Sequence, residues 1–179
     1  MSTSPTNARF VNLTDLWHDA THSDEFGLSN YMAFEVAEIV GICKHRGFVM
    51  PTVYQGVYNL LDRLTEDELF PCLRKLNIKF AAYTPLAGGF LTERFFIPMP
   101  EAKDAPLSKF DSSSKYSSFY TSRYFPSSSA VAELKDIVGA HNLTLTEVAL
   151  RWLQWHSKLQ AGDLGVIASG NSTRLSSAP

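Results

Sequence analysis

Residues 78–89 read "IKFAAYTPLAGG", and this segment indicates which class of fold the chain adopts. Its first half, 78–83, is a continuous apolar run, typical of a strand in a parallel sheet whose two faces are both covered. Its second half turns at Thr84 and Pro85 and then places Gly88 and Gly89 side by side. Adjacent glycines let backbone amides approach a bound group that side chains would keep away. We therefore expect a buried strand that ends beside a flat, anionic ligand.

Strand and helix patterns alternate before this segment. Residues 26–30 predict a short strand, and the helix that follows has apolar residues at helical spacing and ends at Gly47 after a basic last turn. Residues 49–55 predict a second strand. A second helix is expected over 65–77, because Thr65 and Glu68 have the spacing of a capping box.

The pattern continues after the glycines. A serine-rich loop is expected over 98–128, helices over 129–140 and 144–157, and a last short strand over 164–168. Four strands separated by helices predict an α/β fold with a parallel sheet and right-handed connections. A complete (β/α)8 TIM barrel needs roughly 250 residues. The 179 residues are too few for a complete barrel, and a piece of about four β/α units would leave two strand edges unpaired; a partial barrel is what the family resemblance described below implies.

Composition limits the classes of partner. The net charge of −2 provides no basic excess for a nucleic acid backbone, and no apolar run is long enough to be a signal peptide or a membrane helix. Cys43 and Cys72 each lie on an apolar helical pattern and are expected to be reduced. A cytoplasmic protein is expected, with an irregular arm at 1–24, the partial barrel at 25–170 and an irregular tail at 171–179.

Each polar cluster follows a strand, at the sheet edge where parallel α/β folds bind ligands. The clusters are Ser29 with Asn30, Gln55, residues 83–89 and residues 169–173. Taken singly, they have plain alternatives: a helix cap, a structural glutamine or an ordinary turn. Together they favour one binding edge, where the Tyr83 ring can stack on a planar heterocycle.

The segment "KFDSSSKYSSFYTSRYF" at 109–125 interleaves basic residues with tyrosines. It is either a disordered serine-rich insertion or a loop that contacts an acidic ligand. His18 and His22 are four residues apart, but the helix that would carry them is weak, so no metal site is expected.

Three segments resemble the aldo-keto reductases, in particular the branch that reduces aflatoxin dialdehyde and succinic semialdehyde, with its fungal relatives. They are "FGLSNYMAFEVAEIVGICKHRGFVMPTVYQGVYNLLDR" (26–63), "ELFPCLRKLNIKFAAYTPLAGGFLTERF" (68–95) and "YTSRYF" (120–125). The resemblance implies a (β/α)8 barrel that binds NADPH and reduces small aldehydes or ketones.

The resemblance also implies roles for particular residues. Ser29, Asn30 and Gln55 match positions that hold the nicotinamide carboxamide, and Tyr83 matches the aromatic residue that stacks on the ring. The residues that match the diphosphate loop are Thr84, Pro85, Leu86, Ala87, Gly88, Gly89, Phe90, Leu91, Thr92 and Arg94, although "LTER" stands where the branch has "LTGK". Lys109, Ser169 and Gly170 match further cofactor contacts, and Tyr120 and Arg123 match contacts to acidic substrates.

The chain departs from the family at both ends. After the last expected strand, where the family has a phosphate-binding loop and a closing helix, the sequence reads "SGNSTRLSSAP". The family's proton donor is a Tyr assisted by Lys, Asp and His, and these come from a part of the barrel that precedes the Ser-Asn motif. No residue here matches that tetrad, so we assign no catalytic residue and expect a truncated, inactive reductase. The alternatives are a non-enzymatic half-barrel module or pseudoenzyme that pairs with a second copy or with a complementing half-barrel, and a chain whose remaining segments are encoded nearby.

Overall fold

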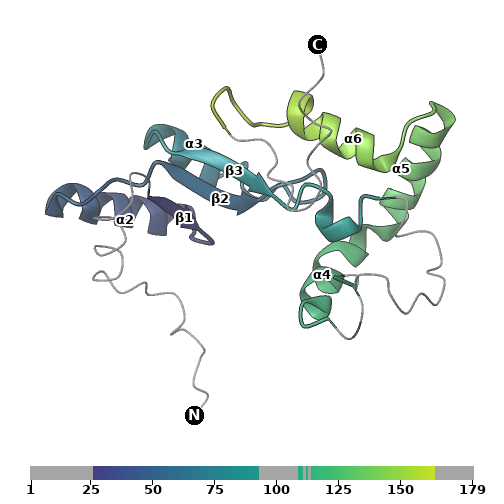
Figure 1. Ribbon diagram of the computed structural model, residues 1–179, viewed down its shortest axis with the longest axis horizontal. Coiled ribbons are helices and arrows are strands. Elements are labelled where there is room, and N and C mark those ends of the chain that lie inside the picture. Colours follow the sequence, from purple (N-terminus) through teal and green to yellow (C-terminus); the bar gives the residue numbers. More distant parts are fainter. Residues whose placement is uncertain (1–25, 93–108, 111, 113, 164–179) are drawn as a thin grey trace. The chain divides into compact units, whose positions relative to one another are not determined.

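The computed structural model describes residues 26–92, 109–110, 112 and 114–163 (Figure 1). The chain divides into two compact units. The first unit comprises Met1–Gln55 and Glu68–Phe80, and the second comprises Gly56–Asp67 and Ala81–Pro179. The predicted strand at 164–168 lies outside the described residues.

A small sheet provides the scaffold. Its strands are β1 (Gly27–Ser29), β2 (Val53–Val57) and β3 (Lys79–Tyr83), in the order β1-β2-β3 (Figure 1). β1 pairs with β2 in parallel, and a helix connects the two strands. This confirms the α/β class and the parallel β1–β2 pairing, while the partial barrel stays an expectation.

Helix α2 (Ala33–Arg46) forms as its pattern predicts. Val36, Val40 and Cys43 are buried on one face. The Glu35 carboxylate accepts a hydrogen bond from the backbone N–H of Met32 (2.6 Å), which satisfies a donor at the first turn. Gly47 ends the helix in the left-handed conformation (φ 69°), as expected for a helix that stops at glycine.

Helix α3 (Leu69–Lys75) starts four residues later than predicted, and the expected capping box at Thr65 and Glu68 is wrong. The Thr65 hydroxyl is buried and has no hydrogen-bond partner. Pro71 gives the physical reason: a helix beginning at Thr65 would place this proline in its interior, whereas a start at Leu69 keeps it in the first turn. Both cysteines are free thiols, as predicted.

The second unit contains a helix where a loop was expected. Within the interval 98–128, residues Ser117–Tyr124 form α4 and Phe125–Ser127 form the short 3₁₀ helix η3. A disordered insertion is therefore wrong for this part. Tyr120 and Tyr124, one helical turn apart, are both buried in the core of the unit, and this burial stabilises the helix despite its many serines.

The remaining helices agree more closely with prediction. Helix α5 spans Ser128–Ala140, α6 spans Leu145–Arg151, and a π-helical turn, η4 (Trp152–His156), continues α6 (Figure 1). The capping box at Thr144 and Glu147 is confirmed: the Glu147 N–H donates to Thr144 Oγ1 (3.1 Å) and the Thr144 N–H donates to Glu147 Oε2 (2.9 Å).

In the part of the chain that the structure describes, no helix has both the length and the apolar character needed to cross a membrane. The same residues contain no group of three or more His, Cys, Asp or Glu side chains that is placed to bind a metal ion.

Candidate functional site

In the first unit, the strand register brings two of the predicted site residues together. Ser29, the last residue of β1, pairs directly with Gln55 of β2. Asn30 follows in the left-handed conformation (φ 63°), which asparagine tolerates better than most residues. The hydroxyl of Tyr54 in β2 donates a hydrogen bond to the backbone carbonyl of Tyr31 (2.7 Å), which connects the turn after β1 to β2. Ser29 is half-buried, whereas Asn30 and Gln55 are exposed.

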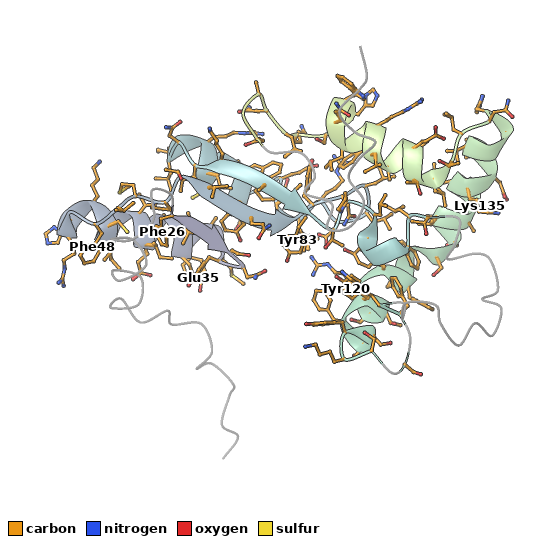
Figure 2. All side chains as sticks on the ribbon, viewed as in Figure 1. Phe26, Glu35, Phe48, Tyr83, Tyr120 and Lys135 are labelled. Carbon is orange, nitrogen blue, oxygen red and sulfur yellow. The ribbon has the colours of Figure 1, made fainter. Side chains whose placement is uncertain are left out.

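In the second unit, Tyr83 lies at the carboxyl end of β3 and Tyr120 lies on α4 (Figure 2). Both side chains line a pocket of about 280 Å³. The complete lining is Val57, Tyr83, Thr84, Tyr116, Phe119, Tyr120 and Tyr124. Five of these seven residues are aromatic, so the pocket offers flat apolar walls that are suited to a planar ring.

Burial changes the acidity of two pocket phenols. Desolvation raises the pKa of Tyr83, and the neighbouring Tyr120 contributes to the increase. Desolvation also raises the pKa of Tyr124 to about 12, against a weaker opposing effect of its hydrogen bond with Asn59. Both side chains are therefore neutral phenols at physiological pH, able to contact a ring without introducing a negative charge.

The glycine pair has a structural explanation at one of its two positions. Gly88 has φ 71°, and a Cβ there would come within 2.4 Å of Tyr120 Cε1. The close approach of the Tyr120 ring thus explains the glycine at position 88 by packing alone. Gly89 differs, because with φ 106° its Cβ would meet nothing within 4 Å. Only Gly89 presents an open backbone face.

Several amides of the same loop are already bonded within it. The N–H of Ala87 donates to Thr84 O (3.0 Å), and those of Gly89 and Leu91 donate to Leu86 O (2.9 and 3.2 Å). The side chains of Phe90 and Leu91 are fully buried in the core of the unit. The loop is therefore held in shape by its own bonds, and these two side chains pack in the core of the unit, while their predicted cofactor role stays a prediction.

Asn59 supports the pocket from behind its lining residues, and the sequence did not indicate it. It is fully buried, and its Nδ2 donates to the carbonyl of Thr84 (3.0 Å) and to the hydroxyl of Tyr124 (3.2 Å). Its Oδ1 accepts from the N–H groups of Leu61 and Asp62. One side chain thus connects the end of β3 with α4. The only signal in the sequence is an asparagine in "YNLLD", where it makes an Asx-type turn.

Asp62 is a second residue that was missed. Its buried carboxylate forms an ion pair with Nε of Arg123, and this hydrogen bond raises the pKa of the guanidinium. The Arg123 guanidinium also lies over the Phe119 ring, 5.5 Å from its centroid. Nearby, Lys109 Nζ donates to the Tyr120 hydroxyl (3.1 Å). The two basic residues predicted to contact ligands therefore both lie beside the pocket, each with a partner.

The other predicted positions are divided between described and undescribed residues. Thr92 Oγ1 donates to Gly89 O (2.7 Å), which closes the glycine loop. Arg94, Ser169, Gly170, His18 and His22 lie outside the described residues. Their proposed or rejected roles stay predictions.

A family model described as the aldo/keto reductase family matches residues 24–177. The chain is 40% identical over 154 residues to aflatoxin B1 aldehyde reductase member 2 of Homo sapiens, covering 83% of this chain and 43% of that protein. It is 37% identical over 153 residues to the aldo-keto reductase pigE of Monascus ruber, covering 83% and 45% of the two chains. It is 34% identical over 161 residues to the oxidoreductase sirO of Leptosphaeria maculans, covering 88% and 47%. The chain thus spans about half the length of these relatives.

Proposed function

Because this chain belongs to the aldo/keto reductase family, we propose that it binds NADP(H) and forms the cofactor-facing part of an oxidoreductase for small aldehydes or ketones. The observation that carries the proposal is the aromatic pocket at the end of β3, where Tyr83 and Tyr120 line the same space. Ligands of parallel α/β folds bind at this edge of the sheet.

The described residues of the second unit suit the ring end of the cofactor. Tyr83 offers a half-buried, neutral aromatic face, and the pocket volume of about 280 Å³ suits a single planar ring. When bound, the nicotinamide supplies a hydride to the carbonyl carbon. We propose that the Tyr83 ring stacks on it and that the surrounding aromatic side chains exclude water.

Other residues have supporting roles in the proposal. Asn59 holds the Thr84 carbonyl and the Tyr124 hydroxyl, so it fixes the strand end against α4. For Ser29, Asn30 and Gln55 of the first unit, a role in holding the carboxamide stays a prediction from the family resemblance. At the diphosphate end, the open backbone of Gly89 is the one position of the glycine pair that leaves space for a ligand.

We assign no proton donor to this chain. Carbonyl reduction requires a proton for the new alkoxide as well as a hydride, and no residue matches the family tetrad of Tyr, Lys, Asp and His. We propose that the 179-residue polypeptide binds the cofactor but turns over no substrate by itself. Steady oxidation of NADPH by a small aldehyde, abolished by Tyr83→Ala, would contradict this proposal.

A calorimetric titration of the purified chain with NADPH tests the binding proposal. We expect a dissociation constant below about 1 mM, and a loss of affinity of at least tenfold in Tyr83→Ala, because a stacked ring contributes on the order of 1–2 kcal/mol. Phe48→Ala is the matched control, since it removes another half-buried aromatic ring that no proposed contact uses. Equal losses in both variants, or no binding by the unmodified chain, would refute the proposal.

A second candidate, a non-enzymatic interaction module, is favoured by exposed apolar side chains in the second unit. Leu64 is 83% exposed and Trp155 is 67% exposed. Large apolar side chains in water favour association with another surface. Light scattering coupled to size exclusion would support this candidate if the chain self-associates and Trp155→Ser reduces the association. A compact monomer at high concentration would contradict it.

A further inference from the structure

We infer that Asp62 determines which ligands the aromatic pocket accepts: by neutralising Arg123 at the edge of the pocket, it makes the pocket select neutral planar rings over carboxylates. The inference rests on the proposed function, because it concerns the pocket that the proposal assigns to a planar ring of the ligand. It also reverses the expectation, based on resemblance alone, that Arg123 contacts an acidic substrate.

The ion pair is built into the fold. The Asp62 side chain is only 5% exposed, whereas that of Arg123 is 33% exposed. Asp62 is fixed at its backbone as well, since its N–H donates to Asn59 Oδ1 (2.9 Å) and its carbonyl accepts from the Asn59 N–H (3.2 Å). The carboxylate is thus held by a buried turn, and it is the fixed member of the pair.

Both charges of the pair lie close to the pocket wall. Arg123 stacks over Phe119, which lines the pocket. Asp62 and Arg123 act in opposite directions on the pKa of Tyr83 and on that of Tyr124, two further lining residues. The pocket therefore experiences the positive charge of Arg123 and the negative charge of Asp62 together.

A ligand carboxylate approaching Arg123 would meet a guanidinium whose charge Asp62 already balances through Nε. It would also bring a second negative charge close to Asp62, whose buried carboxylate water screens poorly. Among the described residues, Lys109 and Lys115 also lie beside the pocket, over the rings of Tyr120 and Tyr116. Both lysines are exposed, so water and salt screen their attraction for an anion. A neutral planar ring is not repelled by Asp62 and needs no cation, so it can bind by stacking on the aromatic side chains of the pocket.

Benzamide and benzoate provide a matched pair of probes, because they share size and shape and differ in charge. We expect calorimetry or ligand-observed NMR, without NADPH, to show that the unmodified chain binds benzamide at least as tightly as benzoate. A preference of tenfold or more for benzoate would overturn the inference. This comparison needs no variant.

Asp62→Asn is the direct test, since it keeps the shape of the side chain and removes its charge. We expect affinity for benzoate to rise by about tenfold while affinity for benzamide stays within twofold. Adding Arg123→Gln to this variant should abolish the gain. Asp136→Asn changes the net charge equally at an exposed position of α5 and should change neither affinity.

The outcomes separate this inference from the proposed function. If folded Asp62→Asn has the same ratio of benzoate affinity to benzamide affinity as the unmodified chain, the role of Asp62 is refuted, whether or not the chain binds NADPH. If the chain does not bind NADPH but Asp62→Asn shifts the ratio of the two probe affinities as expected, the cofactor proposal is refuted and the inference about the selectivity of the pocket is supported. If neither probe binds to the chain or to the variant, the pocket is not a binding site and the inference fails.

Discussion

The two units carry their predicted site residues in different ways. In the first unit, Asn30 and Gln55 are exposed side chains at or near strand ends, and the fold does not depend on them for its core. In the second unit, Tyr120 is part of the core, and Tyr83 lines the pocket together with Thr84 and Tyr124, which Asn59 holds in place. Substitutions of the site residues in the second unit should therefore affect folding and binding together, whereas substitutions of Asn30 or Gln55 in the first unit should affect binding alone.

Asn59→Ala provides the severest test of this difference. It removes the side-chain hydrogen bonds that Asn59 makes to the Thr84 carbonyl, to the Tyr124 hydroxyl and to two turn amides in a buried region, and of these groups the Thr84 carbonyl keeps its bond from the Ala87 N–H. We expect the free energy of unfolding, measured with urea, to fall by about 2–4 kcal/mol. Gln55→Ala in the first unit should change it by less than about 0.5 kcal/mol. A larger loss for Gln55→Ala than for Asn59→Ala would invalidate the comparison.

Gly88→Ala should have the next largest effect. The new Cβ would clash with the Tyr120 ring and would also adopt an unfavourable positive φ. We expect a loss of about 1–3 kcal/mol in urea unfolding. Gly41→Ala in α2 is the control: a Cβ there meets nothing within 4 Å, and alanine favours a helix, so stability should rise by about 0.5–1 kcal/mol. If Gly88→Ala raised the free energy of unfolding as Gly41→Ala does, the Tyr120–Gly88 packing would be absent.

Alkaline pH should weaken the second unit through its buried tyrosines. Desolvation raises the pKa of Tyr58 and that of Tyr124 to about 12, compared with about 10 for a tyrosine in an unfolded chain. Folding therefore favours the neutral phenol. This stabilisation is complete below pH 10 and is lost as the pH rises from about 10 to about 12.

We expect Tyr124→Phe to reduce this dependence on pH, with an effect of about 1–2 kcal/mol between pH 9 and pH 12. Urea unfolding at a series of pH values provides the measurement. An equally steep loss of stability in Tyr124→Phe would show that this phenol is not the titrating group.

The smallest effects concern two threonines that share one sequence pattern. Thr144→Ala removes a working helix cap and should cost about 1 kcal/mol of unfolding free energy. Thr65→Val removes a buried hydroxyl that has no partner, so stability should stay the same or rise. If Thr65→Val costs as much as Thr144→Ala, the assignment of the start of α3 is wrong.

Sequence reasoning succeeded where one local rule determines the structure. Helical spacing and Gly47 predicted α2, and the run at 78–83 predicted β3. It failed where two rules compete. The pattern at Thr65 and Glu68 favoured a helix cap, but Pro71 requires the helix to start later. The serines of α4 favoured a loop, but the burial of Tyr120 and Tyr124 stabilises a helix there.

The site was harder to predict than the fold. The resemblance selected Tyr83, Tyr120 and Arg123, which the structure places in or beside one pocket. It did not reveal Asn59 or Asp62, because their importance comes from partners 25 to 65 residues away in the chain. No local pattern in a single sequence specifies such contacts.

The central claim is that the Tyr83 ring receives the nicotinamide of NADP(H). NOE measurements between the nicotinamide ring protons and selectively labelled tyrosine rings test it most directly. The account predicts NOEs to Tyr83 that vanish in Tyr83→Ala. If saturating NADPH gave NOEs only to other aromatic residues, and Tyr83→Ala left this pattern unchanged, the claim would be contradicted.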